Sequence, residues 1–222
     1  MKSELLKSLK KIGVDTRFVS VIENRIYINN LKLSRFSRSK EEEFLKLYPQ
    51  INVLRSKMLQ RTCIKASRNL AHCLHPKDRI FLLKDKDPIN FALYVILEPY
   101  QRKYGIELIL SDDIKDLAGL NVDLVASAIT LDNEVLNILN QMLYGEKIEL
   151  ISSVKAKNHQ NIIYPLINIQ KDWIYSWMEY EFPKFGVQKY ETEEFLSFLE
   201  TIIPDVKENL YKSALFVSKK AK

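Results

Sequence analysis

The sequence predicts an α/β fold in which a parallel sheet is sandwiched by helices, with a small N-terminal β-ribbon and a basic helix before it. Two patterns favour this fold class: short apolar runs alternate with helical repeats after residue 75, and short links join these segments. The composition agrees, because apolar residues make up 46% of the 222 residues and charged residues 28%. These are globular proportions, which exclude a disordered or fibrous chain.

The first third of the chain is expected to hold two helices around the ribbon. Leucines recur at helical spacing in the first twelve residues, which predicts an amphipathic helix in place of a secretory signal. Residues 23–33 alternate apolar and polar side chains around a turn at Asn29-Asn30, the pattern of a short ribbon. A long helix over 40–74, bent after Pro49, is expected to follow.

Strand and helix patterns alternate from residue 76 onward. Asp87-Pro88 supplies an N-cap and a first-turn proline, and Pro99 loosens the helix that they open. Asp205 and Glu208 form the pattern of a capping box before a terminal helix. Strands are expected over 79–83, 107–110 and 123–128, an extended segment over 161–165, and helices over 88–104, 132–144 and 171–180.

These patterns divide the chain into two domains, residues 1–75 and 76–222, which differ in charge. The first holds 16 Lys and Arg against 6 Asp and Glu, which gives a net charge of +10. The second has a net charge of −4, so the whole chain has a net charge of +6. An asymmetry of this size marks a surface that faces a polyanion, most often nucleic acid. The candidate RNA-binding side chains lie in the later part of the long helix: Arg55, Lys57, Arg61, Lys65 and Arg68.

The chain has only two cysteines, Cys63 and Cys73. They cannot build a four-cysteine zinc site or a three-cysteine iron–sulfur site, so no metal is expected, although His72 and His75 leave a mixed site open beside Cys73. The longest apolar run, residues 91–97, is far shorter than the roughly 20 residues that cross a bilayer. No membrane contact is expected, and the protein is placed in the cytoplasm.

Four segments follow one another in the order of a known family. Residues 78–90 stand where that family has a strand and Ser-Gly-Gly-x-Asp-Ser, and 126–134 resemble its Ala-Thr-Gly-His-Asn-Leu-Asp-Asp-Glu helix. Residues 164–167 and 204–207 resemble its Arg-Pro-Leu strand and Pro-Gly-Thr-Lys helix. The chain thus resembles the PP-loop (adenine nucleotide α-hydrolase) superfamily, and within it the tRNA 2-thiolation enzymes, which adenylate a uridine oxygen before sulfur enters. The resemblance covers most of the chain and implies a PP-loop/HUP-like fold.

The departures from the family pattern lie mainly in the nucleotide loop, whose residues here are Leu83, Lys84, Asp85, Lys86, Asp87 and Pro88. In the family, two loop glycines let backbone N–H groups close around the pyrophosphate of ATP, and Lys84 and Asp85 stand in their place. Family members also carry cysteines in the interval that residues 111–122 occupy here without any. The resemblance therefore implies a degenerate copy, a pseudoenzyme with no catalytic residues, no cofactor and no metal.

The expected function is that of a non-catalytic tRNA-binding subunit that supports 2-thiolation of the wobble uridine. Its expected partners are tRNA and an active PP-loop thiolase in a heterodimer, or a second copy of the chain. One alternative is a divergent PP-loop enzyme that acts on tRNA, with Lys84 or Lys86 binding a different anionic substrate. Another is an RNA-binding or structural module outside the family. Trp173 and Trp177 are expected in the core or at a partner surface rather than against bases.

Overall fold

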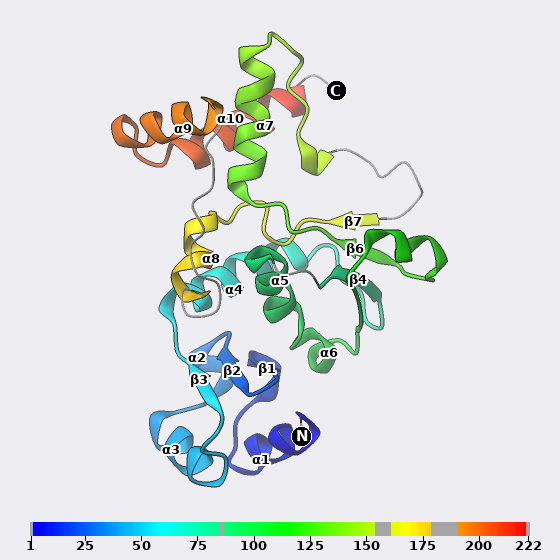
Figure 1. Cartoon of the computed structure of the whole chain (residues 1–222), viewed down its shortest axis with the longest axis vertical. Coiled ribbons are helices and arrows are strands. Elements are labelled where there is room, and N and C mark those ends of the chain that lie inside the picture. The colour runs from blue at the N-terminus through cyan, green and yellow to red at the C-terminus, as the bar shows by residue number, and fades with distance from the viewer. Residues whose placement is uncertain (1, 85–86, 154–160, 179–190, 221–222) are drawn as a thin grey trace.

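The computed structural model describes residues 2–84, 87–153, 161–178 and 191–220 (Figure 1). Two sheets follow each other along the chain. The first has the strand order β1-β2-β3, with β1 at Val19–Ile22, β2 at Arg25–Ile28 and β3 at Asn52–Leu54. The second has the order β5-β4-β6-β7, with β4 at Arg79–Leu83, β5 at Glu107–Ser111, β6 at Leu124–Ala126 and β7 at Asn161–Ile163.

Strands β1 and β2 form the expected antiparallel ribbon, but its turn lies at Glu23-Asn24 and not at Asn29-Asn30. The side chain of Asn30 instead accepts a hydrogen bond from the backbone N–H of Leu33 at 2.9 Å. It thereby caps the short helix α2, Leu31–Ser34. Asn side chains serve turns and helix caps by the same local hydrogen bonding, so the sequence pattern does not separate the two outcomes.

The expected long helix is in fact two helices, α3 at Arg38–Leu47 and α4 at Lys57–Leu70, with β3 between them. Pro49 follows the end of α3, and a proline cannot donate the backbone hydrogen bond that a further helical turn needs. Strand β3 then pairs in parallel with β2 and widens the ribbon into a sheet. Ser56 starts α4, since its hydroxyl accepts from two backbone N–H groups at 3.2 Å.

All four strands of the second sheet are parallel and helices flank it, which confirms the predicted fold class. Asp87 caps the first helix as predicted, and the break at Pro99 separates that helix from a short second one. The remaining helices are α1 at Lys2–Lys11, α5 at Pro88–Leu97, α6 at Tyr100–Lys103, α7 at Leu131–Leu143, α8 at Lys171–Met178, α9 at Glu191–Ile202 and α10 at Val206–Lys220.

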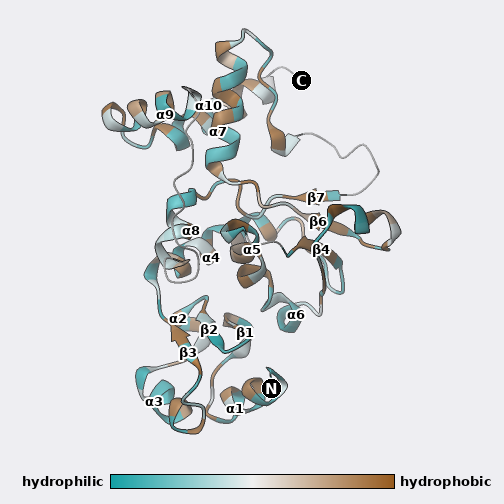
Figure 2. Ribbon diagram, viewed as in Figure 1, coloured by the Kyte–Doolittle hydropathy of each residue, from teal (hydrophilic) through white to brown (hydrophobic). Residues whose placement is uncertain are grey.

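The main core lies between the second sheet and helices α4, α5 and α8. Ile80 and Leu82 of β4 point toward it, because alternate side chains of a strand share one face. Ile22 and Tyr27 reach the same core from the first sheet, so the two sheets pack together through it. Hydrophobic residues gather in α5 and in the strands of the second sheet (Figure 2). No helix in the described ranges has the length and apolar character needed to span a bilayer.

Helices α9 and α10 pack on α7 at the far end of the molecule from α1 (Figure 1), where their apolar residues form a small core of their own. The terminal helix begins where the sequence predicts, but the predicted capping box is wrong. A helix N-cap residue usually has an extended backbone, whereas Asp205 has a left-handed φ of 53°. Glu208 accepts a hydrogen bond from Gln170 Nε2 at 3.0 Å, and so ties α10 to the segment before α8.

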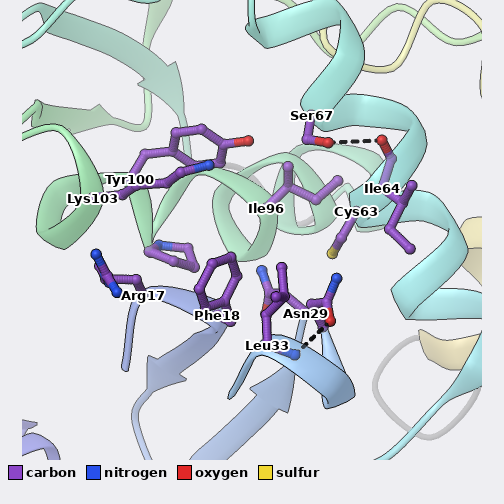
Figure 3. A pocket seen from close by; sticks show the side chains of 12 residues that line it. Arg17, Phe18, Asn29, Leu33, Cys63, Ile64, Ser67, Ile96, Tyr100 and Lys103 are labelled. Atoms are coloured by element: carbon purple, nitrogen blue, oxygen red, sulfur yellow. Dashed lines mark hydrogen bonds between the residues drawn. The ribbon is translucent and has the colours of Figure 1, made fainter. Parts of the chain in front are cut away.

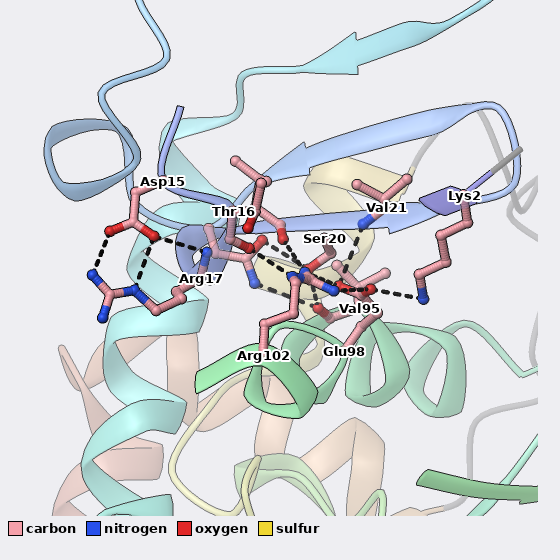
Figure 4. A network of polar contacts seen from close by, with 11 residues as sticks. Lys2, Asp15, Thr16, Arg17, Ser20, Val21, Val95, Glu98 and Arg102 are labelled. Carbon is pink, nitrogen blue, oxygen red and sulfur yellow. Dashed lines mark hydrogen bonds and ion pairs between the residues drawn. The ribbon is translucent and has the colours of Figure 1, made fainter. Parts of the chain in front are cut away.

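A buried ion-pair network joins the first sheet to α6 (Figure 4). Glu98 is fully buried, and its carboxylate pairs with Arg102 and, at 2.8 Å, with Lys2. Arg102 also donates from Nε to the carbonyl oxygen of Thr16 at 2.9 Å and from Nη2 to that of Val19 at 2.7 Å. These bonds hold β1 and the turn before it against the α/β part of the chain.

Candidate nucleotide cleft and basic surface

A cavity of about 480 Å³ opens at the C-terminal ends of β4 and β6. The chain leaves β4 toward β5 on one side and later returns to β6 on the other, so these two strand ends form the switch point of the sheet. Open parallel sheets bind ligands at such points, in pockets of roughly 300–1,000 Å³. The polar side chains around the cavity include Asp87, Asn90, Asn133, Lys171 and Tyr175.

The floor of this cavity is apolar because of the alternation along the strands. Phe81 of β4, Val125 of β6 and Ile162 of β7 point away from the main core and line the cavity. The polar groups come instead from the starts of α5, α7 and α8. An apolar floor with polar groups at its edge suits the flat base of a nucleoside and the polar groups attached to it.

The predicted nucleotide loop lies at this cavity. Leu83 and Asp87 line it. Lys84 is exposed, and its backbone N–H donates to the carbonyl oxygen of Ser111 at 2.8 Å, which continues the pairing of β4 with β5. Asp87 accepts from the N–H of Ile89 at 3.1 Å, and Pro88 fills the first turn of α5. Two further loop residues of the prediction, Asp85 and Lys86, lie outside the described residues.

The start of α7 forms another wall and is held by two adjacent side chains. Asn133 Oδ1 accepts from the backbone N–H of Thr130 at 3.1 Å and from its hydroxyl at 2.7 Å, which fixes Asn133 at the cavity. Asp132 accepts from the backbone N–H of Lys171 at 2.6 Å and pairs with Lys207 at 2.7 Å. These contacts tie the start of α7 to α8 and α10.

Two titratable groups near the cavity are perturbed. Burial raises the pKa of the Tyr175 phenol, and the carboxylates of Asp87, Asp132 and Asp172 raise it further, so the hydroxyl stays protonated and can donate a hydrogen bond. Burial by itself lowers the pKa of Lys207, but its bonds to Asp132 and Glu200 outweigh that effect and raise the pKa above its usual value.

A structural carboxylate directly follows Asn133 on α7, and no sequence signal reveals its role. Glu134 is fully buried, and it accepts from the backbone N–H groups of Ile151 at 2.7 Å and Ser152 at 3.2 Å. Burial raises the pKa of this carboxyl, and the two backbone hydrogen bonds partly offset the rise. Glu134 thus holds the short helical turn η3, Ile151–Ser153, against α7.

The structure separates the five predicted RNA-binding residues into two groups. Lys57, Arg61 and Arg68 are exposed along one face of α4. Lys65 is turned toward the core, with Nζ 4.8 Å from the centre of the Trp173 ring and 3.9 Å from Glu208 Oε1. Arg55 precedes the helix and is mostly buried in an ion pair with Glu41. The basic surface therefore consists of Lys57, Arg61 and Arg68.

The two cysteines are poor nucleophiles in this fold. Cys63 lies on the wall of a cavity of about 160 Å³ between α4, α6 and the first sheet (Figure 3), and burial raises the pKa of its thiol. Burial also raises the pKa of Cys73. Within the described ranges, no three His, Cys, Asp or Glu side chains are grouped closely enough to hold a metal ion.

Helix α8 packs its aromatic face inward, in line with the core interpretation. Trp177 is 4% exposed and meets the ring of Tyr27 edge-on, with the two centroids 6.1 Å apart. Trp173 is partly buried against the same core and lies beneath Lys65. Trp177 is thus excluded as a stacking platform for RNA bases.

The chain is similar to known proteins in part of its sequence and in its fold. No family model matches the chain. A probable sulfurtransferase of Methanocaldococcus jannaschii is 33% identical over 110 residues, which are 47% of this chain and 31% of that protein. The chain therefore spans about a third of the length of this relative. Among solved structures, the U34-tRNA thiolase NcsA from Methanococcus maripaludis, with its [4Fe-4S] cluster, aligns with a TM-score of 0.54. The alignment covers 77% of this chain and 83% of NcsA at 14% identity.

The residues of this chain do not fit a [4Fe-4S] cluster such as the one in NcsA. Protein clusters of this kind are bound by cysteine thiolates, usually four. This chain has two cysteines, and burial raises the pKa of both. A cluster bound by this chain alone would lack ligands.

The comparisons also correct one expectation from the sequence. Both similar proteins are described as enzymes, a sulfurtransferase and a thiolase, which contradicts the interpretation of this chain as a non-catalytic pseudoenzyme. The expectation of a shared architecture is confirmed, since the parallel four-stranded sheet and its flanking helices match the thiolase fold. The chain therefore has a PP-loop/HUP-like α/β fold.

Proposed function

We propose that the chain is a divergent PP-loop enzyme, or the nucleotide-binding part of one, that transfers sulfur to a uridine of tRNA. The observation that carries this proposal is the cavity of about 480 Å³ at the switch point of a sheet whose fold matches that of a U34-tRNA thiolase. The 33% identity to a probable sulfurtransferase supports the same chemistry. In this proposal an adenine nucleotide occupies the cavity, and RNA lies on the exposed face of α4.

The proposed reaction replaces one oxygen of uridine by sulfur in two steps. The uridine oxygen attacks the α-phosphorus of ATP, and pyrophosphate leaves. A hydrosulfide then attacks the ring carbon that carries the adenylated oxygen. AMP leaves with that oxygen, and a double bond forms between the ring carbon and the sulfur. Neither step changes the oxidation state of the uridine carbon, so no external oxidant or reductant is needed.

The cavity offers groups for both parts of a nucleotide. Lys171 at the cavity and Lys84 at the end of β4 are cations that can meet phosphate oxygens. Asn90 and Asn133 place amide groups where a base or a ribose would lie. Asp87 brings a negative charge close to the phosphates, so we expect weaker nucleotide binding than a glycine-rich loop would give.

The sulfur must come from outside this chain. A thiolate is the form of cysteine that attacks or carries sulfur, and burial disfavours the thiolate of both Cys63 and Cys73. A sulfide ion is therefore the donor in this proposal.

The proposal includes association with a second protein chain, either another copy or a PP-loop thiolase. Three apolar side chains on one face of α9 are exposed to solvent: Phe195 is 42% exposed, Phe198 57% and Ile202 60%. Apolar residues that share an exposed helix face are typical of interaction surfaces. Light scattering of the purified chain, alone and mixed with a PP-loop thiolase, measures the assembly directly. A monomer in both samples would remove this part of the proposal.

Two binding measurements test the nucleotide and RNA parts of the proposal. Calorimetry with ATP and magnesium ions should detect one site, and a labelled tRNA transcript should bind with an affinity that falls steeply with salt. If ATP at millimolar concentration produces no binding heat and protects no residue of the cavity from hydrogen exchange, the nucleotide assignment is wrong. If the transcript does not bind, the RNA assignment is wrong.

A further inference from the structure

A groove of about 420 Å³ lies between α2, the start of α3 and the start of α4. Four cations from two separate stretches of the chain line it: Arg35, Arg38, Arg55 and Lys57. In the part of the chain that the structure describes, its lining includes no carboxylate. We call it the arginine groove. Only the fold brings Arg35 and Arg38 next to the basic helix, since a helix and a strand separate them in the sequence.

Arg55 builds the groove and contributes little to its free charge. Its Nη2 donates to the carbonyl oxygens of Phe36 at 2.7 Å and Ser37 at 3.1 Å, and its guanidinium pairs with Glu41. These bonds hold residues 36 and 37 beside the first turn of α4. Glu41 is buried behind the groove and neutralises Arg55, so the charge that faces solvent comes from the other three cations.

Those three cations are accessible to a ligand. Arg35 and Lys57 are exposed. The side chain of Arg38 is 74% exposed, and its 3.5 Å contact with Glu41 is the kind of surface pair that costs little to exchange for another anion. Arginine guanidinium groups bind phosphate oxygens in pairs, which favours a phosphate as the ligand of this groove.

The arginine groove is continuous with the basic surface on α4. Lys57 belongs to both, and Arg61 and Arg68 follow it along the helix. Lys57 and Arg68 are separated by roughly 16 Å at 1.5 Å per residue. A row of cations of this length fits a chain of phosphates better than a single small anion.

We propose that the arginine groove binds the sugar-phosphate backbone of an RNA strand, whose neighbouring phosphates lie along α4. This assignment rests on the RNA-directed function proposed for the chain and adds Arg35 and Arg38 to its RNA-binding residues. The contacts are to phosphates, so they position the RNA without reading its sequence.

The test is a titration of a labelled tRNA transcript, followed by fluorescence anisotropy at several salt concentrations. The variant R35Q/R38Q removes two cations, and K7Q/K10Q removes two exposed cations of α1 as a matched control. We expect R35Q/R38Q to lower the slope of log K against log salt by roughly 1.4–1.8, because each phosphate contact accounts for about 0.7 to 0.9. Binding at low salt should weaken about tenfold or more, and the control should match the wild type.

Two further measurements test whether charge alone is responsible and whether the groove binds a small anion. R35K/R38K keeps both charges and should retain most of the salt slope. An unchanged slope in R35Q/R38Q, with normal RNA binding by the wild type, overturns the groove assignment and leaves the proposed function standing, whereas a wild type that binds no RNA overturns both. Displacement of RNA by micromolar pyrophosphate, lost in R35Q/R38Q, would show a small-anion site and also overturn the assignment. If the double variant unfolds at a lower temperature, R35Q alone replaces it, with an expected loss of slope of about 0.7 to 0.9.

Discussion

Arg102 and Glu98 face each other one helical turn apart, and two hydrogen bonds of 2.6 Å join their guanidinium and carboxylate groups. The carboxylate is fully buried, and the same guanidinium donates to the carbonyl oxygens of Thr16 and Val19. One arginine thus neutralises a buried charge and fastens the N-terminal sheet to the α/β part. The orientation of the first sheet, which carries Arg35 and Arg38 on the segment between β2 and β3, depends on this pair.

Replacing Arg102 should therefore destabilise the whole chain. R102M leaves the Glu98 carboxylate buried with Lys2 and the backbone N–H of Val21 as its remaining partners, and removal of one partner from a buried pair costs about 3–5 kcal/mol. Urea unfolding followed by circular dichroism measures the loss. The control R17M removes an exposed arginine paired with Asp15 and should leave the free energy of unfolding nearly unchanged. Equal stabilities of R102M and the control would contradict the role given to Arg102.

Glu134 should make the stability depend on pH. Burial raises its pKa in the folded chain above the ordinary value of 4.5. Below pH 4.5 the carboxyl is protonated in both states, and its favourable contribution is complete. As the pH rises through the pKa that Glu134 has in the folded chain, its contribution to the free energy of unfolding is lost, because Glu134 ionises more readily in the unfolded chain. The non-titrating variant E134Q lacks this loss, whatever its stability at low pH.

The measurement is urea unfolding of the wild type and E134Q at pH 4 and pH 7. The free energy of unfolding of the wild type should fall relative to that of E134Q between the two values. A relative gain by the wild type with rising pH would show that the pKa of Glu134 is lowered by folding and that hydrogen bonding dominates over burial.

Lys171 should contribute to nucleotide affinity without holding the fold. Its backbone N–H, not its side chain, makes the 2.6 Å bond to Asp132, so K171A keeps the tie between α7 and α8. Loss of a hydrogen bond to a charged group costs about 1.5–3 kcal/mol, which is roughly a tenfold to hundredfold loss of affinity for ATP with magnesium. Calorimetry measures it, and K212A, an exposed lysine on α10, is the matched control. Equal affinities of the two variants for ATP would show that Lys171 does not contact the phosphates.

The exposed face of α4 should bind tRNA by charge. R61E/R68E reverses two of its cations, and we expect unrelated tRNAs to lose affinity by about the same factor, since phosphate contacts carry no sequence information. Filter binding with two tRNAs of different anticodon, at two salt concentrations, measures this. K7E/K10E makes the same change of charge on α1. A selective loss for one tRNA would instead indicate base recognition by α4.

The α/β part could be predicted from the sequence because its signals are local. The apolar run from Arg79 to Leu83 and the cap at Asp87-Pro88 give β4 and α5 correctly, since a buried strand and an N-cap each depend on a few adjacent residues. The break at Pro99 follows in the same way. The cavity follows from the strand order β5-β4-β6-β7, which places the switch point between β4 and β6 and which local signals do not reveal.

The N-terminal part could not be predicted as well because its structure depends on distant contacts. The three-residue strand β3 is held by parallel pairing with β2 and has no apolar alternation long enough to reveal it. Arg55 looks like a surface cation in the sequence, yet the fold places Glu41 against it. The approach of Arg35 and Arg38 to Lys57 is likewise set by packing, so the sequence did not point to the arginine groove.

The central claim is that this chain takes part in the transfer of sulfur to tRNA at the expense of ATP. The most direct measurement mixes the purified chain with an unmodified tRNA transcript, ATP with magnesium ions, and sulfide, and then quantifies thiouridine by mass spectrometry of the digested RNA. The account predicts thiouridine that requires ATP, appears with an equal amount of AMP, and falls about tenfold or more in K171A but not in K212A. The claim is contradicted if the chain alone makes no thiouridine and if its addition leaves the thiouridine yield of an active PP-loop thiolase unchanged.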